Sequence, residues 1–212
     1  MITVHHLGVS QSERIVWLCE ELELPYELKR YERDAATRLA PPAYKALHPL
    51  GSAPVITDGA LALAESGAII DYILAKHGKG RLQVAPGAPS YPDYSYWFHF
   101  ANGTFMPRSM GSLFATMLGA AGTPVAQFLQ ARDDQAHVTV EARLGKVPYF
   151  AGDALTAADI MMVFPLTTMR YFQARDLSPF PNIRAYLKRI GERPAYQRAM
   201  AKGDPGMTPK LD

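Results

Sequence analysis

The stretch ITVHHLGVSQSERIVWLCEEL, residues 2–22, decides the fold of this chain, because its hydrophobic periodicity changes halfway along. Residues 2–7 are apolar and β-branched and too short for a helix, which predicts a strand. From about Ser12 to Leu22 apolar residues recur three and four positions apart, which predicts an amphipathic helix. Residues 26–31 alternate like a second strand. A strand, helix and strand in this order normally form a right-handed parallel crossover, so an α/β domain is expected.

The start of this helix carries two hydroxyl side chains, Ser10 and Ser12. Unpaired backbone N–H groups in a first helical turn, together with the helix dipole, favour an anion or a thiolate there. Either serine could simply cap the helix. Alternatively Ser12 caps it, and Ser10 donates its hydroxyl to a bound anion. No Gly-x-Ser-x-Gly elbow surrounds Ser10 and no base is identified near it, which favours a hydrogen-bond donor over a nucleophile.

A hairpin and another helix are expected next. Residues 55–57 and 60–63 flank Asp58-Gly59, which is a strong signal for a tight turn between two strands. An amphipathic helix follows Glu65-Ser66 and closes at Gly78. The helix start at Glu65-Ser66 offers a hydroxyl and unpaired N–H groups that could receive a carboxylate. Capping alone explains the serine equally well, whereas the glutamate could face the ammonium group of a ligand.

Prolines mark the segment between the second strand and the hairpin. Pro41-Pro42 can start a short helix at its first turn, and residues 49–54 form a loop. Pro54 ends this loop at the entry of a strand, where a trans peptide bond is the ordinary expectation. The alternative is a cis bond that turns the backbone of Val55 outward, toward a peptide-like ligand.

A linker at residues 80–89, dense in glycine and proline, separates a first domain of residues 1–79 from a second of residues 90–212. The strand signals stop there, and an all-α C-terminal domain is expected to follow the α/β N-terminal domain. The final residues, 203–212, are expected to be a loose tail. The expected helices of the second domain are 94–118 with kinks at Pro107 and Gly111, 124–144, a third opened by Thr156, 181–191, and a fifth starting at Pro194.

Composition excludes several classes of function. The formal net charge is only +2 and the basic residues are scattered, so nucleic acid is not expected as a partner. The single cysteine, Cys19, excludes an intrachain disulfide, and its place on the apolar stripe predicts a buried structural role. His5 and His6 point to opposite faces of a strand, and no metal site is expected. No apolar run is long enough for a membrane span, and without a signal segment a cytoplasmic location is expected.

Four motifs together resemble the glutathione transferases, in that family's order and spacing. A fifth, Thr156-Ala157-Ala158-Asp159-Ile160, looks like the capping motif of the family's helical domain, so the resemblance covers nearly the whole chain. Each motif is weak alone, and the combination is specific. The four motifs are Ser10-Gln11-Ser12-Glu13-Arg14-Ile15-Val16-Trp17, Glu20-Glu21-Leu22-Glu23-Leu24-Pro25-Tyr26, Pro49-Leu50-Gly51-Ser52-Ala53-Pro54-Val55-Ile56 and Ala64-Glu65-Ser66-Gly67-Ala68-Ile69.

The resemblance implies a thioredoxin-like N-terminal domain that binds glutathione, a helical C-terminal domain and a homodimer. Ser10 matches the activating serine of the theta-like and related bacterial classes, and the Ala53–Pro54 bond is expected to be cis. The other implied glutathione contacts are the backbone of Val55 for the cysteinyl part, Glu65 and Ser66 for the γ-glutamyl end, and, with less agreement with the family pattern, His48 and Ser52 for the glycine carboxylate.

The implied activity is that of a detoxifying glutathione transferase, in which the thiolate attacks an electrophilic carbon or a hydroperoxide. Glutathione is then a co-substrate, and no cofactor is expected. The alternative is a non-catalytic glutathione-binding protein of the same fold, and Ser12 or Tyr26 are alternative activating groups. Apolar side chains of the long helix could line a pocket for the hydrophobic electrophile or belong to the core: Tyr96, Phe100, Phe105, Met106 and Met110.

Overall fold

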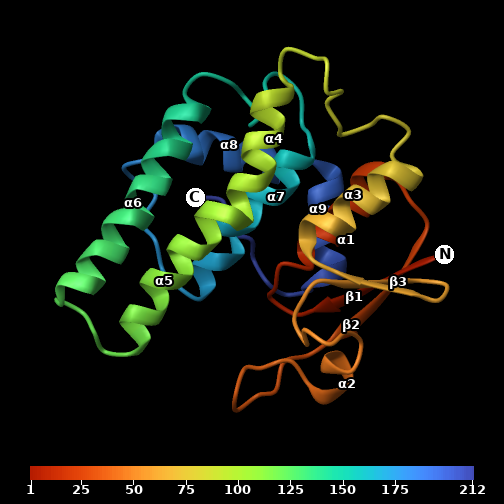
Figure 1. The fold of residues 1–212 in the computed structure, drawn as a ribbon, viewed down its shortest axis with the longest axis horizontal. Coiled ribbons are helices and arrows are strands. Elements are labelled where there is room, and N and C mark those ends of the chain that lie inside the picture. The colour runs from red at the N-terminus through yellow and green to blue at the C-terminus, as the bar shows by residue number, and fades with distance from the viewer. The chain divides into compact units, whose positions relative to one another are not determined.

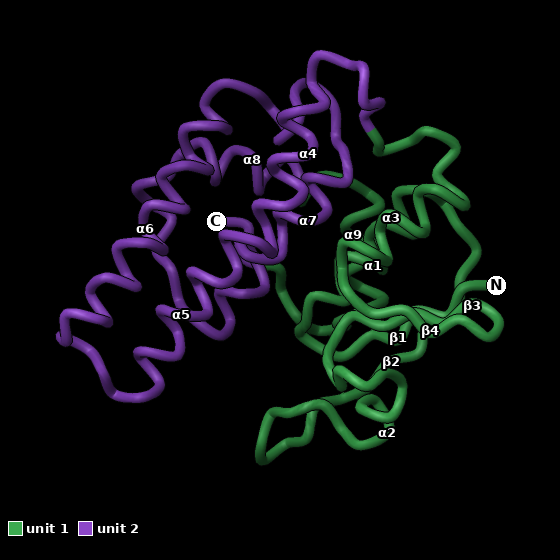
Figure 2. The backbone as a smooth tube through the Cα atoms, in the orientation of Figure 1, with its two compact units in different colours: residues 1–83, 191–209 green, residues 84–190, 210–212 purple.

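A computed structural model describes all residues from Met1 to Asp212. The chain divides into two compact units (Figures 1 and 2). Unit 1 comprises residues 1–83 and 191–209, and unit 2 comprises residues 84–190 and 210–212. The first boundary falls inside the linker expected at residues 80–89.

Unit 1 contains a four-stranded mixed sheet with the strand order β2-β1-β3-β4. β1 (Ile2–Leu7) and β2 (Tyr26–Tyr31) are parallel, as a crossover through a helix requires. β3 (Val55–Asp58) runs antiparallel to β1 and to β4 (Leu61–Ala64). The expected hairpin is present, but Asp58 still pairs with Leu61, so its two-residue turn lies one position later than predicted.

Three helices from the same N-terminal part of the chain accompany this sheet. They are α1 (Glu13–Leu22), the single turn α2 (Pro42–Lys45) and α3 (Ser66–His77). Their starts agree with the sequence predictions to within about a residue. The sheet and helices therefore form the thioredoxin-like α/β domain that was expected.

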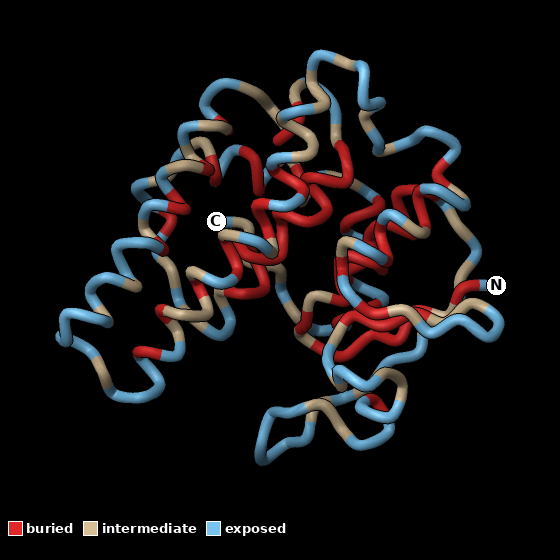
Figure 3. The backbone as a smooth tube through the Cα atoms, viewed as in Figure 1, coloured by how far each residue is buried: buried red, intermediate tan, exposed pale blue.

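A fourth helix of unit 1 comes from the far end of the chain. α9 (Pro194–Gly203) packs against α1, whereas the sequence grouped residues 191–209 with the helical domain. Arg193 holds Glu21 through two bonds of 2.7 and 2.8 Å, and Arg198 bonds Glu20 at 2.9 Å. These pairs cover the polar side of α1, so all ten of its residues are buried (Figure 3).

Unit 2 is helical, as expected for the C-terminal domain. Its elements, in order, are α4 (Tyr91–Phe100), a π-helical segment (Ala101–Phe105), α5 (Met106–Met117), α6 (Pro124–Leu144), α7 (Ala157–Leu166), a 3₁₀ turn (Thr168–Tyr171) and α8 (Pro181–Gly191).

The single helix expected over residues 94–118 is interrupted by the π-helical segment just before Pro107. Proline lacks an N–H and its ring collides with the carbonyl four residues earlier, so a wider turn ahead of it relieves both problems. Gly111 does not interrupt α5. A Cβ on this glycine would lie 3.3 Å from Leu129 of α6, so glycine here permits close helix packing.

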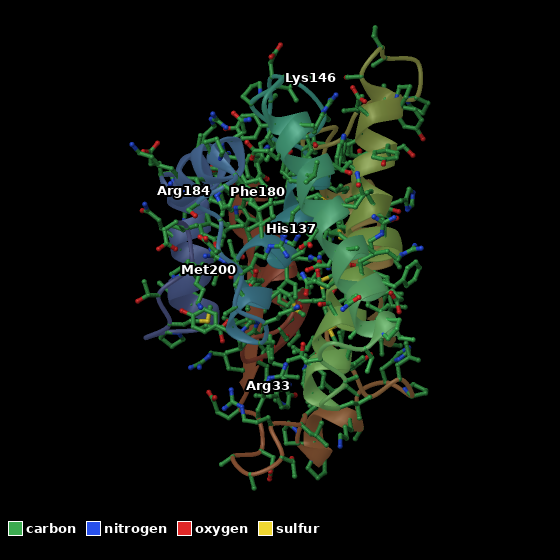
Figure 4. The ribbon with its side chains drawn as sticks, turned by 90° about the vertical axis from the view of Figure 1, so that its left-hand side faces the viewer. Arg33, His137, Lys146, Phe180, Arg184 and Met200 are labelled. Carbon is green, nitrogen blue, oxygen red and sulfur yellow. The ribbon has the colours of Figure 1, made fainter.

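Buried side chains make specific contacts at the start of α7 and in the middle of α6. Asp159 is fully buried and accepts four hydrogen bonds, from the backbone N–H groups of Phe150 and Thr156 and from the hydroxyls of Thr156 and Tyr186. Burial raises the pKa of Asp159 to about 6, against the lowering effect of these donors. His137 of α6 lies beside Phe180, with ring centroids 5.9 Å apart (Figure 4).

The C-terminal segment is not the loose tail that was expected. Asp204, directly after α9, is buried and accepts a hydrogen bond from the backbone N–H of Val9 at 2.9 Å. The carbonyl of Gly203 accepts from Arg30 Nε at 2.8 Å. Within unit 2, Arg170 donates to the carbonyl of Asp212 at 3.0 Å. None of the helices is long and apolar enough to cross a membrane.

Candidate functional site

The loop between β1 and α1 places Ser10 and Ser12 side by side. Ser10 is 6% exposed and Ser12 is fully buried, and their hydroxyl oxygens are 2.7 Å apart. Ser12 stands at the N-cap position, but its hydroxyl does not cap the helix, so this part of the sequence interpretation is wrong. The reason is geometric: Ser12 has helical dihedral angles instead of the extended ones of a capping residue, and its hydroxyl points back toward β1.

Hydrogen bonds connect the two serines to a buried histidine and an aspartate. Ser12 Oγ lies 2.9 Å from His6 Nδ1, and His6 Nε2 lies 3.1 Å from Asp204 Oδ2. Ser10 Oγ also donates to the carbonyl of Leu7 at 2.7 Å. The sequence did not reveal that the imidazole of His6 lies two hydrogen bonds away from Ser10. No local signal could have paired it with Asp204, because 198 positions separate them.

Two residues beside the candidate serines have left-handed backbone conformations. Val9, directly before Ser10, has φ = 52°, and Glu65, directly before Ser66, has φ = 70°. Positive φ is costly for residues with a Cβ, and such strain is concentrated at functional sites. Val9 is held by its surroundings: its backbone N–H donates to Asp204, and its carbonyl accepts from Arg33 at 3.0 Å.

Arg14 links the helix start of α1 to that of α3. Its guanidinium is buried and donates to Ser66 Oγ at 3.3 Å and to Gln11 Oε1. Burial lowers the pKa of Arg14 to about 9. Ser66 is 1% exposed, whereas Glu65 is exposed. Sequence reasoning gave Arg14 no role, although an arginine among the apolar positions of a buried helix was a signal for one.

The loop before β3 contains the cis Ala53–Pro54 peptide bond. Val55 lies in an interior strand, in register with His5 on one side and Ala64 on the other, and is 1% exposed. Both edges of Val55 therefore face neighbouring strands. Ala53 is half-buried and precedes the strand.

His48 and Ser52 lie on the same loop, half-buried and exposed respectively. His48 Nδ1 accepts a hydrogen bond from the backbone N–H of Leu50 at 3.3 Å. The proton of a neutral His48 then sits on Nε2, which can donate to an anion. The Ser52 hydroxyl makes no hydrogen bond in the structure, so the only link between Ser52 and the candidate site is its position on the same loop as His48.

The alternative thiol-activating group Tyr26 is occupied elsewhere. Its hydroxyl donates to Glu20 Oε1 at 2.8 Å, and burial together with Glu20 raises its pKa well above the usual value. Cys19 is fully buried, as predicted, and burial raises the pKa of its thiol to about 12. No group of three or more histidine, cysteine, aspartate or glutamate side chains is arranged to hold a metal ion.

The five apolar residues proposed for an electrophile pocket differ in exposure. Phe100, Phe105 and Met106 are at most 7% exposed and belong to the core of unit 2. Phe105 packs edge-on against His137, with centroids 4.9 Å apart. Tyr96 is 53% exposed and Met110 is half-buried. Only these last two present much surface to a ligand.

A thioredoxin-like unit with a hydroxyl at its first helix start, combined with a helical unit, defines the class of protein. Residues 1–75 match the family "Glutathione S-transferase, N-terminal domain", and residues 120–194 match "Glutathione S-transferase, C-terminal domain". Glutathione S-transferase 3 of Schizosaccharomyces pombe is 32% identical over 217 residues, covering 95% of this chain and 88% of that protein. Glutathione S-transferase GstB of Escherichia coli is 28% identical, covering 89% of this chain and 91% of that protein.

Solved structures agree with these relatives. The crystal structure of a glutathione S-transferase from Actinobacillus pleuropneumoniae has a TM-score of 0.89 and 37% identity, and covers 100% of this chain and 95% of that one. The glutathione transferase URE2P8 of Phanerochaete chrysosporium, solved with oxidised glutathione, shares the fold at a TM-score of 0.77 and 21% identity, covering 95% of this chain and 94% of that one. This chain belongs to the glutathione S-transferase family.

Proposed function

We propose that this glutathione transferase uses Ser10 to hold the sulfur of glutathione as a thiolate, which then attacks an electrophilic small molecule or a hydroperoxide. One observation carries the proposal: the Ser10 hydroxyl stands at the start of α1, next to the buried pair of Ser12 and His6. Nothing in the comparisons favours the alternative of a non-catalytic glutathione-binding protein.

The physical reason is the acidity of a thiol. An ordinary thiol has a pKa of about 8.5, so little thiolate exists at neutral pH. A hydroxyl donor and a helix N-terminus both favour the anion, and lowering the pKa by about two units corresponds to about 2.7 kcal/mol. Ser10 offers both features at one place.

The remaining glutathione contacts are proposed from the same unit. Ser66, held by Arg14, and the exposed carboxylate of Glu65 suit the γ-glutamyl end, which carries a carboxylate and an ammonium group. The segment from Ala53 to Val55 offers backbone groups to the cysteinyl part. Ala53 suits this pairing better than Val55, because Val55 is flanked by strands on both sides.

The glycine end of glutathione and the second substrate are expected to contact other residues. The Nε2–H of His48 can donate to the glycine carboxylate, with Ser52 exposed nearby on the same loop. An apolar electrophile is expected to contact Tyr96 and Met110, since the other three candidates are buried. A homodimer and a cytoplasmic location are proposed on the family resemblance, and neither glutathione nor the electrophile requires a prosthetic group.

Ser10→Ala tests this function, with Ser90→Ala as the matched control, because Ser90 stands at the start of α4 and makes no capping bond. Ser10→Ala is expected to lower the turnover of a model aryl halide about a hundredfold, which is the loss equivalent to two pKa units. Its affinity for glutathione should stay within a few-fold, and Ser90→Ala should resemble the wild type. An unshifted thiolate titration in Ser10→Ala would refute the role of Ser10. Glutathione binding without turnover of a halide, peroxide or isothiocyanate by the wild type would favour the non-catalytic alternative.

A further inference from the structure

We propose that His6, oriented by Asp204, accepts the thiol proton of glutathione through Ser12 and Ser10. The inference rests on the proposed function, because it assumes that the sulfur of glutathione lies against the Ser10 hydroxyl. It adds an internal base to that function and names where the proton goes.

The relay, meaning Asp204, His6, Ser12 and Ser10, is continuous. Its three hydrogen bonds measure 3.1 Å from Asp204 Oδ2 to His6 Nε2, 2.9 Å from His6 Nδ1 to Ser12 Oγ, and 2.7 Å from Ser12 Oγ to Ser10 Oγ. All four residues are at most 7% exposed, and His6 and Ser12 are fully buried. Only its Ser10 end is assigned to a ligand, so proton exchange between sulfur and His6 has a path without bulk water.

The direction of each bond follows from the end of the relay at Asp204. Burial raises the pKa of this carboxyl, but the hydrogen bond and the charge of His6, the backbone N–H of Val9 and the charge of Arg30 hold it below its usual value. An ionised carboxylate only accepts, so His6 Nε2 carries a proton and donates it. In a neutral His6, Nδ1 is then the acceptor. This is the tautomer needed to receive a proton from Ser12, as the aspartate of a serine-protease triad selects it.

The proton count closes in both states. Before transfer, the thiol S–H donates to Ser10 Oγ, the Ser10 hydroxyl donates to Ser12 Oγ, and the Ser12 hydroxyl donates to His6 Nδ1. Transfer breaks the S–H bond and gives its proton to Ser10, while Ser10 passes its own proton to Ser12 and Ser12 passes its own to His6. The products are a thiolate and an imidazolium. The bonds between His6, Ser12, Ser10 and the sulfur have reversed, so each hydroxyl now donates toward the sulfur, while His6 Nε2–H still donates to Asp204.

Charged groups of both signs lie around His6. Asp204 supplies the compensating negative charge from the segment after α9, and β2 brings Arg30 into register with His6. The guanidinium of Arg30 donates to the carbonyl of Gly203 and to the carboxylate of Glu32. Gly203 packs directly over the ring, since a Cβ there would lie 3.3 Å from His6 Cε1 and Nε2.

The backbone next to Ser10 completes this arrangement. The backbone N–H of Leu7 donates to Ser12 Oγ at 3.2 Å, and the Leu7 carbonyl accepts from Ser10 Oγ at 2.7 Å. The second lone pair of Ser12 stays available to Ser10. The Ser10 hydroxyl can rotate from the Leu7 carbonyl to Ser12 Oγ or to a thiolate and has an acceptor in each position. Proton transfer along the relay therefore needs only rotation of hydroxyl groups.

The test counts the protons released when glutathione binds. At a pH of about 7.5, about nine-tenths of an ordinary thiol is protonated and about nine-tenths of an ordinary imidazole is neutral. A relay that keeps the proton gives a thiolate, seen by its ultraviolet absorbance, with close to no proton released. Calorimetry in two buffers of different ionisation enthalpy measures that release. A wild type that forms the thiolate and releases close to one proton per glutathione overturns the proposal.

Three variants assign the result to these residues. His6→Gln and Asp204→Asn should lower the thiolate fraction of bound glutathione at neutral pH about a hundredfold, the loss equivalent to about two pKa units of the thiol. Asp204→Asn keeps the size and the acceptor for Val9, so it covers the case in which His6→Gln fails to fold. His5→Gln is the matched control, because His5 is a buried neighbour that bonds Tyr31 and Thr57 and lies outside the relay. A thiolate fraction in Asp204→Asn equal to that in His5→Gln contradicts the relay.

The relay and the function proposed for Ser10 fail in different ways. If Ser10→Ala loses the thiolate while His6→Gln and Asp204→Asn keep it, Ser10 holds the sulfur without an internal base, and only the relay is refuted. If wild-type protein with bound glutathione shows no thiolate at any pH below the pKa of the free glutathione thiol, the function itself is refuted.

Discussion

The carboxylate of Asp159 gives the sharpest stability prediction for this fold. Replacing it with alanine removes the acceptor of four hydrogen bonds, two of them from the backbone N–H groups of Phe150 and Thr156. Each buried donor left without a partner costs about 1–3 kcal/mol, and relief of the buried charge offsets part of the sum. We expect Asp159→Ala to lower the free energy of unfolding by about 3–5 kcal/mol.

Urea unfolding followed by circular dichroism measures this loss. Asp159→Asn keeps the size and one acceptor and should lose less than the alanine variant. Asp153→Ala is the matched control, since Asp153 is an exposed carboxylate a few residues earlier, and surface changes of this kind stay within about 0.5 kcal/mol. If Asp159→Ala is no less stable than Asp153→Ala, the four hydrogen bonds do not hold the start of α7.

Two further predictions concern titration and reactivity. Hydrogen bonds from Lys76 and Tyr72 lower the pKa of Asp58 to about 2, so the stabilisation by this ion pair is present above a pH of about 4 and is lost as the pH falls through about 2. The difference in melting temperature between the wild type and Lys76→Met should therefore shrink over that range, and a constant difference would contradict the assignment. Burial raises the pKa of Cys19 to about 12, so its thiol should resist a thiol reagent in the folded protein. In denaturant it should react as fast as a cysteine in an unfolded chain. Rapid labelling of the native protein would show that α1 opens.

Most of the secondary structure could be predicted because the spacing of apolar residues along the sequence reflects the local geometry of the backbone. The strand over residues 2–7 and the helix over residues 181–191 were placed to the residue. The kink expected at Pro107 takes the form of a π-helical segment before it. The kink expected at Gly111 is wrong because a neighbour decides the outcome there: the glycine lets α6 pack closely.

The candidate site was predicted only in part for the same reason. Ser10 and Ser66 stand out in the sequence because Ser66 begins a helix and Ser10 lies in the loop directly before one. Their partners do not, since the link from Arg14 to Ser66 crosses from α1 to α3 and appears only when the two helices pack. The hydroxyl of Ser12 was predicted to cap α1, but the fold offers it His6 instead, and the helical conformation of Ser12 excludes capping.

The sequence by itself determined the strands, the helix starts, the hairpin, the hydroxyl of Ser10 and membership in a family. Only the tertiary structure decided that α9 returns to cover α1 and that Asp204 reaches His6 across 198 positions. The physical reason is range. Periodicity and capping depend on residues within a turn or two, whereas the orientation of a buried imidazole depends on whichever distant carboxylate the packed chain brings within hydrogen-bond distance.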